Sequence, residues 1–381
     1  MQKINDLGLS FGIWVEPEMI NVESNLYKEH PDWTMDIPGK NHAEGRNQRM
    51  LDLANPEVVD YMIASMSNLF ASANIAYVKW DMNRIVSDCY SKYLPAKRQG
   101  ETLHRYVLGL YRMMDELTKR FPEILFEGCA SGGNRFDLGI LCFFPQIWAS
   151  DNTDALYRVN GMTGYSYGYP MSVMGAHVSS CPNHQTLRTT PLETRFAVAA
   201  FGVLGYECNL CDMKKEDLEE IRKQIALYKE WRNVLQYGTF YRGRNAKIHE
   251  WTCVSEDKRQ AVGMIMQELT QPNHPTGQYF PKGLDASARY EFTNRSMRYN
   301  ILGFGDLVNT VSPVHIKQDS LVHQVLAKCV TMPGETERYR ASGSVLMAGV
   351  KLAQGFSATG YSEETRYFPD FASRMYFMQQ I

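Results

Sequence analysis

The chain has 381 residues, 44% of them hydrophobic and 22% charged, which is typical of a globular protein and excludes a disordered or fibrous class. Its 40 Lys and Arg residues nearly balance 42 Asp and Glu residues, and a net charge of −2 provides no basic field for nucleic acid or anionic lipid. No stretch approaches the roughly 18 consecutive apolar residues of a membrane span, and the eight scattered cysteines favour a reducing compartment. We therefore expect a cytoplasmic protein with neither nucleic-acid nor membrane partners.

Short apolar runs alternate with helical patterns between residue 11 and about residue 210, which is typical of βα units that build a parallel sheet. A first helix is expected from Asn55, a capping residue followed by Pro56 at the first helical position. Further helices are expected from Tyr106 to Phe121 and from Asp217 to about Leu235. The six expected strands are Phe11 to Glu16, Tyr77 to Asp81, Ile124 to Cys129, Ile147 to Ser150, Ser172 to Val178 and Val203 to Asn209.

Beyond the last of these helices the pattern changes to runs of period two, which predict strands of an antiparallel sheet. The runs are Gln260 to Gln267, Arg289 to Thr293 and Ser344 to Leu352. We therefore predict two domains, a βα domain over residues 1–243 and an antiparallel β domain over residues 244–381.

Charged side chains follow two of the expected strands, and the C-terminal strand ends of a barrel of βα units build its active site. Lys79 and Asp81 share one face of their strand by the period-two rule. A cation beside a carboxylate keeps it ionised, as a nucleophile must be, although an ion pair at a strand end can also be purely structural.

Asp151 and Asp154 follow the strand that contains Trp148, whose ring could supply an apolar wall that raises a carboxyl pKa. Each of the two aspartates could instead form an Asx turn or cap a helix. Carboxylates on two strands of one barrel are the groups that glycoside hydrolysis requires, one to attack the anomeric carbon and one to transfer a proton.

Other residues at the strand ends suit a sugar site. Trp14 could stack on a sugar ring or pack within the barrel, and Glu16 and Arg46 are further candidate residues of the site. The glycine-rich turn at 127–133 lacks a phosphate-binding fingerprint and is interpreted as a backbone that allows close approach of a ligand. Two patterns have the spacing of metal ligands but lack a full set of them. Cys208 and Cys211 have no second cysteine pair, and His177, Cys181 and His184 have no obvious fourth ligand. We expect no metal and no organic cofactor.

Several motifs in order along the chain, FGIWVEPEMI, RNQRMLDLANPEV, YVKWDMNR, EGCASGGNRFDLG, IWASDNTDA and HVSSCPNHQT, resemble bacterial α-galactosidases of glycoside hydrolase family 36. The resemblance implies a (β/α)8 TIM barrel followed by a C-terminal antiparallel β-sandwich, and retaining hydrolysis of terminal α-galactosides. It implies Asp81 as nucleophile and Asp151, in preference to Asp154, as acid/base. It also implies a galactose subsite formed by Trp14, Arg46, Lys79, Cys129 and Trp148.

The resemblance matches the six expected strands with barrel strands three to eight, so the barrel is expected to be incomplete. Family members carry an N-terminal sandwich and a second strand that ends in Asp-Asp-Gly-Trp, and full-length relatives are expected to be homo-oligomers. We expect this chain alone to be nearly inactive. The alternatives are an α-N-acetylgalactosaminidase or a transgalactosylase of the same clan, and a non-catalytic remnant. Ser131 and Asn134 depart from the glycines of many relatives.

Overall fold

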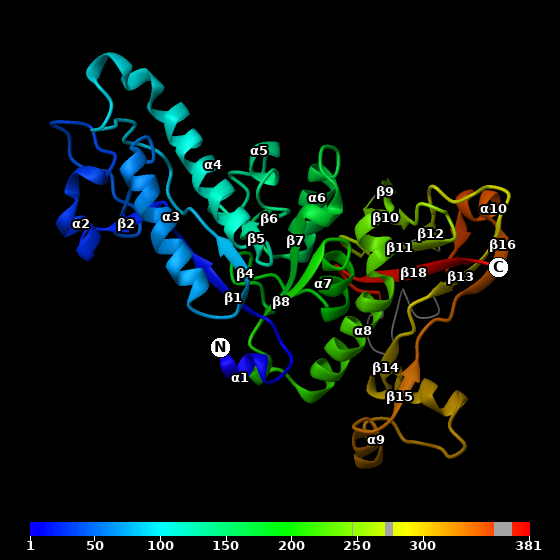
Figure 1. Ribbon diagram of the computed structural model, residues 1–381. Coiled ribbons are helices and arrows are strands. Elements are labelled where there is room, and N and C mark those ends of the chain that lie inside the picture. Colours follow the sequence, from blue (N-terminus) through cyan, green and yellow to red (C-terminus); the bar gives the residue numbers. More distant parts are fainter. Residues whose placement is uncertain (246, 271–276, 354–367) are drawn as a thin grey trace. The chain divides into compact units, whose positions relative to one another are not determined.

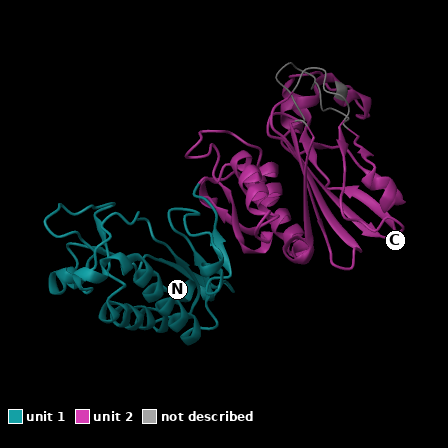
Figure 2. Cartoon of the chain, turned by 90° about the horizontal axis from the view of Figure 1, so that it is seen from above, with its two compact units in different colours: residues 1–151 teal, residues 152–381 magenta. Residues whose placement is uncertain are grey.

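The computed structural model describes residues 1–245, 247–270, 277–353 and 368–381. The chain forms two compact units, residues Met1–Asp151 and Asn152–Ile381, which Figure 2 shows in teal and magenta. Both carboxylates proposed from the sequence, Asp81 and Asp151, belong to the first unit.

Unit 1 is built on a parallel sheet with the strand order β1 (Phe11–Val15), β4 (Ile75–Trp80), β5 (Leu125–Gly128) and β6 (Gln146–Trp148). Parallel neighbours need long crossover connections, and helices α3 (Pro56–Ala71) and α4 (Thr102–Arg120) provide two of them. Four predicted strands and two predicted helices of this region are confirmed, with ends that differ by a few residues.

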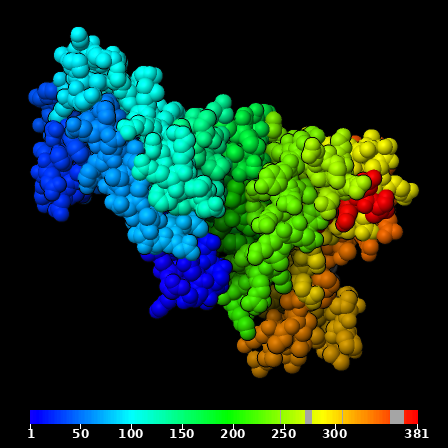
Figure 3. Space-filling view, in the orientation of Figure 1, coloured from blue at the N-terminus to red at the C-terminus, as the bar shows by residue number. Residues whose placement is uncertain are grey.

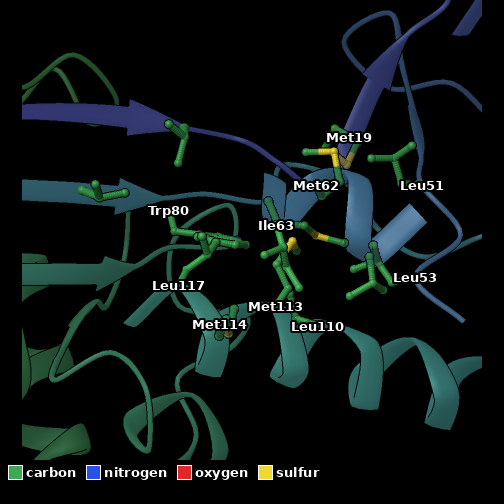
Figure 4. Packing of buried hydrophobic residues seen from close by; sticks show 14 of the residues in the cluster. Met19, Leu51, Leu53, Met62, Ile63, Trp80, Leu110, Met113, Met114 and Leu117 are labelled. Atoms are coloured by element: carbon green, nitrogen blue, oxygen red, sulfur yellow. The ribbon is translucent and has the colours of Figure 1, made fainter. Parts of the chain in front are cut away.

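One face of this sheet packs on the two helices. Asn55 caps α3 by accepting a hydrogen bond from the Glu57 backbone N–H, as its sequence position predicted. Figure 4 shows Trp80 of β4 directed toward Leu117 of α4, inside a cluster that also contains Met114. These side chains are buried, and they set the distance between the sheet and α4.

The remaining elements of unit 1 precede β1 or lie in the connections between its strands. Strands β2 and β3 pair in antiparallel fashion and bring the segment around residue 46 back toward the end of β1. The full set of these remaining elements is α1 (Gln2–Asn5), β2 (Met19–Asn21), α2 (Asn25–Glu29), η1 (Pro31–Trp33), β3 (Gln48–Met50), η2 (Ala96–Glu101) and α5 (Leu138–Leu141).

Unit 2 begins with the last βα elements. Strands β7 (Met174–Ser179) and β8 (Val203–Glu207) pair in parallel, as the sequence predicted, and α6 (Ala155–Tyr165), α7 (Leu192–Ala199) and α8 (Lys215–Tyr237) belong to the same unit. Short 3-10 turns η3 (Met171–Val173) and η4 (Leu210–Asp212) precede β7 and follow β8.

An antiparallel sheet forms the rest of unit 2, with the order β16-β13-β18-β11-β10-β9 (Figure 1). Its strands are β9 (Thr239–Asn245), β10 (Ile248–Val254), β11 (Gln260–Gln267), β13 (Arg289–Asn294), β16 (Arg338–Ser342) and β18 (Ser373–Gln380). Smaller elements are β12 (Gln278–Tyr279), β14 (Arg298–Asn300), η5 (Ile301–Thr310), α9 (Leu321–Leu326), β15 (Thr331–Pro333), α10 (Gly343–Met347) and β17 (Val350–Lys351).

Both faces of this sheet are covered. On one face the rings of Tyr279 and Tyr376 stack with centroids 5.2 Å apart, and Tyr279 belongs to the small sheet β12–β17. On the other face Trp231 of α8 meets Phe377 with centroids 4.9 Å apart. The apolar contacts on both sides explain why β10 and β11 are buried along nearly their whole length.

One predicted strand is wrong. Residues Ser344 to Leu352 form the helix α10 and only the short strand β17. The Ser342 hydroxyl accepts a hydrogen bond from the backbone N–H of Val345, and this cap starts a helix where the alternation of apolar residues predicted a strand.

Among the described residues, no helix is long and apolar enough to cross a membrane.

The packing of α4 generates a stability prediction. Leu117 is fully buried, whereas Leu108 on the same helix is 53% exposed, and α4 lies at the surface in Figure 3 (cyan). Leu117→Ala should lower the free energy of unfolding by about 2 to 5 kcal/mol, because it leaves a cavity. The matched control Leu108→Ala should change it by less than about 0.5 kcal/mol. Urea denaturation of both variants provides the measurement, and equal losses would contradict this packing.

Candidate active site

Two carboxylates lie just beyond the carboxyl ends of strands on either side of β5. Asp81 directly follows β4, and Asp151 lies three residues beyond β6. Because β4, β5 and β6 are parallel neighbours, these chain ends emerge at the same edge of the sheet.

The Asp81 side chain is buried and surrounded by neutral hydrogen-bond donors. Its Oδ2 accepts from the Trp14 indole N–H at 3.2 Å and from the Asn83 amide at 2.7 Å. Its Oδ1 accepts from the Met82 backbone N–H at 2.8 Å, and the Cys129 thiol is a fourth donor. The carboxylate is therefore fixed in orientation by contacts from three strand ends.

These donors also keep Asp81 ionised. Burial raises the pKa of Asp81, but the hydrogen bonds from Cys129, Asn83, Met82 and Trp14 together outweigh burial, and the pKa lies below its ordinary value of 3.8. The sequence interpretation had assigned this effect to Lys79. The structure gives Lys79 a different partner, because its Nζ lies 3.2 Å from Glu127 Oε1.

Trp148 connects Lys79 with Asp151. The Lys79 ammonium lies 4.3 Å from the centroid of the Trp148 ring, a cation–π contact. The Trp148 indole N–H donates to Asp151 Oδ1 at 2.9 Å. The buried Trp148 thus meets the exposed Asp151 through a polar contact, where the sequence had suggested an apolar wall.

Asp154 has the structural role that the sequence left open. Its carboxylate caps α6 by accepting from the Leu156 backbone N–H, and it is buried. It also forms an ion pair with Arg188 and accepts from the Thr186 hydroxyl at 2.6 Å. A carboxylate with three such partners is held inside unit 2 as part of its framework.

The glycine-rich turn lies against the chain that leads to Asp151. Gly132 has a φ of +83°, and a Cβ atom there would lie 3.1 Å from Ser150 Cα and 3.2 Å from the Asp151 nitrogen. A side chain is therefore excluded on both conformational and steric grounds. The sequence predicted close approach of a ligand, whereas the close approach seen in the structure is that of the Ser150–Asp151 backbone.

Cys129 starts this turn with a protonated thiol. Burial and the neighbouring charge of Asp81 raise the pKa of Cys129 to about 12. The thiol consequently acts as a hydrogen-bond donor to Asp81 at neutral pH.

Arg46 lies on a tight turn directly before β3. Gly45 and Gln48 pair across the turn, and Arg46 and Asn47 have φ values of 55° and 58°. The guanidinium is exposed and lies 3.6 Å from Glu16 Oε1, an oxygen that also accepts from the Asn83 backbone N–H. Glu16 therefore joins Arg46 to the segment that follows Asp81.

Sequence reasoning gave no role to two residues that support the site, Glu18 and Asn83, and it named Glu127 only as part of the glycine-rich turn. Glu18 and Glu127 are both fully buried. Buried acids in apolar motifs were the available signal, because such residues are seldom buried without partners. Their partners, however, are distant in sequence and emerge only from the fold.

The two patterns with metal-like spacing take other roles. His177 Nδ1 lies 3.0 Å from Glu207 Oε2, and Cys208 contacts the sulfur of Met213 at 3.9 Å. Within residues 1–245, 247–270, 277–353 and 368–381, no group of three or more His, Cys, Asp or Glu side chains could hold a metal ion.

Two family sequence profiles match most of the chain. The sequence profile described as Melibiase matches residues 1–238, and that of the glycosyl hydrolase family 36 C-terminal domain matches residues 248–378. The chain belongs to glycoside hydrolase family 36.

Relatives in this family support the assignment along most of the chain. Alpha-galactosidase AgaA of Geobacillus stearothermophilus is 48% identical over 296 residues, 76% of this family 36 chain and 40% of the relative. Alpha-galactosidase Mel36A of Lactobacillus acidophilus is 46% identical over 290 residues, 76% of this chain and 40% of the relative. The chain therefore spans about 40% of the length of these relatives.

Solved structures of family 36 superimpose on all of the chain. The α-galactosidase of Lactobacillus brevis has a TM-score of 0.83 at 37% identity, covering 100% of this chain and 46% of that protein. A variant of AgaA in complex with raffinose has a TM-score of 0.82 at 39% identity, with the same coverage. The expected fold class, part of a TIM barrel followed by a C-terminal sandwich domain, is confirmed.

The donors around Asp81 generate a second prediction. Asn83→Ala removes the 2.7 Å hydrogen bond, and the pKa of Asp81 should rise toward its ordinary value, because that bond favours the charged form. The variant should therefore protonate Asp81 at a higher pH than the parent. The carboxyl ¹³C signal of Asp81, assigned with Asp81→Asn, reports this titration. The control Ser131→Ala removes only the hydroxyl that donates to Asn83 Oδ1, so its titration should stay close to the parent's. An unshifted titration in Asn83→Ala would contradict the assigned role.

Proposed function

We propose that this chain carries the catalytic residues of a retaining α-galactosidase, with Asp81 as nucleophile and Asp151 as acid/base. The observation that carries the proposal is the surrounding of Asp81, whose pKa is held below its ordinary value by four neutral donors despite burial. A nucleophilic carboxylate has to be ionised and oriented before substrate arrives, and these contacts supply both conditions.

In the first step an Asp81 carboxylate oxygen attacks the anomeric carbon of a terminal α-galactoside. The bond from that carbon to the leaving oxygen breaks, and the leaving oxygen takes the proton of Asp151. The product is a covalent galactosyl ester of Asp81. The indole N–H of Trp148, which donates to Asp151 Oδ1, keeps that carboxyl group oriented during the transfer.

In the second step Asp151 acts as the base. It takes a proton from water, the water oxygen attacks the anomeric carbon, and the ester bond to Asp81 breaks. Two displacements at the same carbon restore the α configuration. Asp81 returns to the ionised state that its donors favour, and Asp151 returns to the protonated state.

We further propose that Trp14, Arg46, Lys79, Cys129 and Trp148 form part of the galactose subsite. Trp14 is 47% exposed although its N–H is tied to Asp81, so its ring is available for stacking on a sugar face. Lys79 and Arg46 are cationic donors for sugar hydroxyls. AgaA variants have been crystallised with raffinose and with stachyose, and this class of α-galactoside oligosaccharide is the substrate we propose.

We propose a domain boundary between residues 243 and 244. The two family profiles, which end at residue 238 and begin at residue 248, support it. The helix α8 ends at Tyr237 and β9 begins at Thr239, so the change from βα units to antiparallel strands falls a few residues before the proposed boundary, which itself lies within β9.

Two variants test the mechanism in a preparation active on nitrophenyl α-galactoside. Asp81→Ala should abolish turnover because no covalent intermediate can form. Asp151→Ala should still react with activated nitrophenyl leaving groups, which need little protonation, and should accumulate the intermediate. Added azide should then release α-galactosyl azide from the Asp151 variant.

The configuration of the azide product decides between the two roles. A β-galactosyl azide from Asp151→Ala would mean that azide had replaced the nucleophile, and the assignments would have to be exchanged. Near-normal hydrolysis by Asp81→Ala would remove Asp81 from the mechanism altogether.

A further inference from the structure

Three polar residues form a row across neighbouring strands beneath the two aspartates. Lys79 of β4 is aligned with Glu127 of β5, and Glu127 is aligned with Gln146 of β6. Aligned residues of adjacent strands project from the same face of a sheet and are close enough to interact. This face is the one that presents Asp81, two residues beyond Lys79.

Glu127 is the centre of this row. Its side chain is fully buried, and Oε2 accepts from the Tyr77 hydroxyl at 2.6 Å and from the Gln146 amide. Burial and the negative charge of Glu127 raise the pKa of Tyr77, so the phenol remains a donor. With two neutral donors on Oε2, the other oxygen, Oε1, lies 3.2 Å from the Lys79 ammonium.

The Lys79 ammonium is held from two sides. Glu127 lies on one side, and the ring of Trp148 lies on the other with its centroid 4.3 Å away. The same Trp148 donates its N–H to Asp151. A continuous series of contacts therefore runs from Glu127 through Lys79 and Trp148 to Asp151.

We propose that Glu127 is a positioning residue, whose buried carboxylate fixes the Lys79 ammonium against the Trp148 ring and thereby orients Lys79 toward substrate and Trp148 toward Asp151. Glu127 is buried and Lys79 is 24% exposed, and taking such a pair out of water costs desolvation that its attraction often fails to repay, so stability alone is a weak reason for a carboxylate in this place. What Lys79 and Asp151 do with substrate rests on the proposed α-galactosidase function, whereas the arrangement of the three side chains does not.

A double-mutant cycle tests the inference in an active preparation that contains the chain. Glu127→Gln keeps the shape of the side chain and removes its charge. It should lower kcat/KM on nitrophenyl α-galactoside on the order of 10- to 100-fold, mostly through KM if Lys79 binds substrate. In a Lys79→Met background the same change should cost less than about threefold, because the group that Glu127 positions is gone.

A matched control separates charge from packing. Tyr77→Phe removes one neutral hydrogen bond from the same carboxylate and leaves its charge, so it should lower kcat/KM less than Glu127→Gln does. Equal losses from Glu127→Gln in the parent and Lys79→Met backgrounds would overturn the inference, since Glu127 would then act independently of Lys79.

A second readout does not depend on activity. The indole N–H resonance of Trp148, assigned with Trp148→Phe, should shift in Glu127→Gln and in Lys79→Met, and the double variant should match Lys79→Met. An unshifted indole signal in a folded Glu127→Gln protein would overturn the inference. Should the parent protein fail to hydrolyse α-galactosides, the proposed function fails, and the indole measurement still decides on Glu127.

Discussion

The geometry of unit 1 depends most on the hydrogen bonds that the Glu18 carboxylate accepts. It has no exposed surface and accepts three hydrogen bonds, from the Trp80 indole at 2.9 Å, the Tyr106 hydroxyl at 2.5 Å and Arg135 at 2.7 Å. Trp80 immediately precedes Asp81, and Arg135 also donates to the carbonyl oxygen of Cys129 at 3.2 Å. A single side chain that follows β1 thus ties together the end of β4, the helix α4 and the turn after β5. Losing one partner of such a buried charge typically costs about 3 to 5 kcal/mol, so the segments carrying the nucleophile and the thiol are fixed together.

The two faces of the sheet of unit 1 have different roles. Val78, Trp80 and Phe126 are buried on the face that packs on α3 and α4. Tyr77, Lys79 and Glu127 alternate with them and form the polar network on the other face. Because side chains on a strand alternate between faces, a shift of one residue in register would exchange the two sets. Packing of the apolar face therefore specifies the position of every charged group on the other.

The positions of the strands and the placement of the two aspartates at strand ends were predictable because they depend on local patterns. Asp81 and Asp151 stand at the ends of apolar runs, and the cap at Asn55 is visible in the residues beside it. Lys79 illustrates what local patterns cannot provide. Its nearest acid in sequence is Asp81, yet its observed partner is Glu127 on the next strand. The partners of Glu18 are likewise 62, 88 and 117 residues away, so their convergence requires the fold. The error at Ser344 to Leu352 has a local cause, since a serine cap started a helix against the alternation.

The turn that carries Arg46 has a thermodynamic consequence for ligand binding. Two successive residues with side chains, Arg46 and Asn47, are held in the left-handed region, where they are less stable than in extended or helical backbone. Cross-turn pairing of Gly45 with Gln48 and the hydrogen bond from the Gln48 side chain to Glu16 hold them there. The chain thus loses the backbone entropy of this turn when it folds. A ligand that contacts the guanidinium has only the side-chain torsions left to restrict, so its affinity is not reduced by the ordering of a loop.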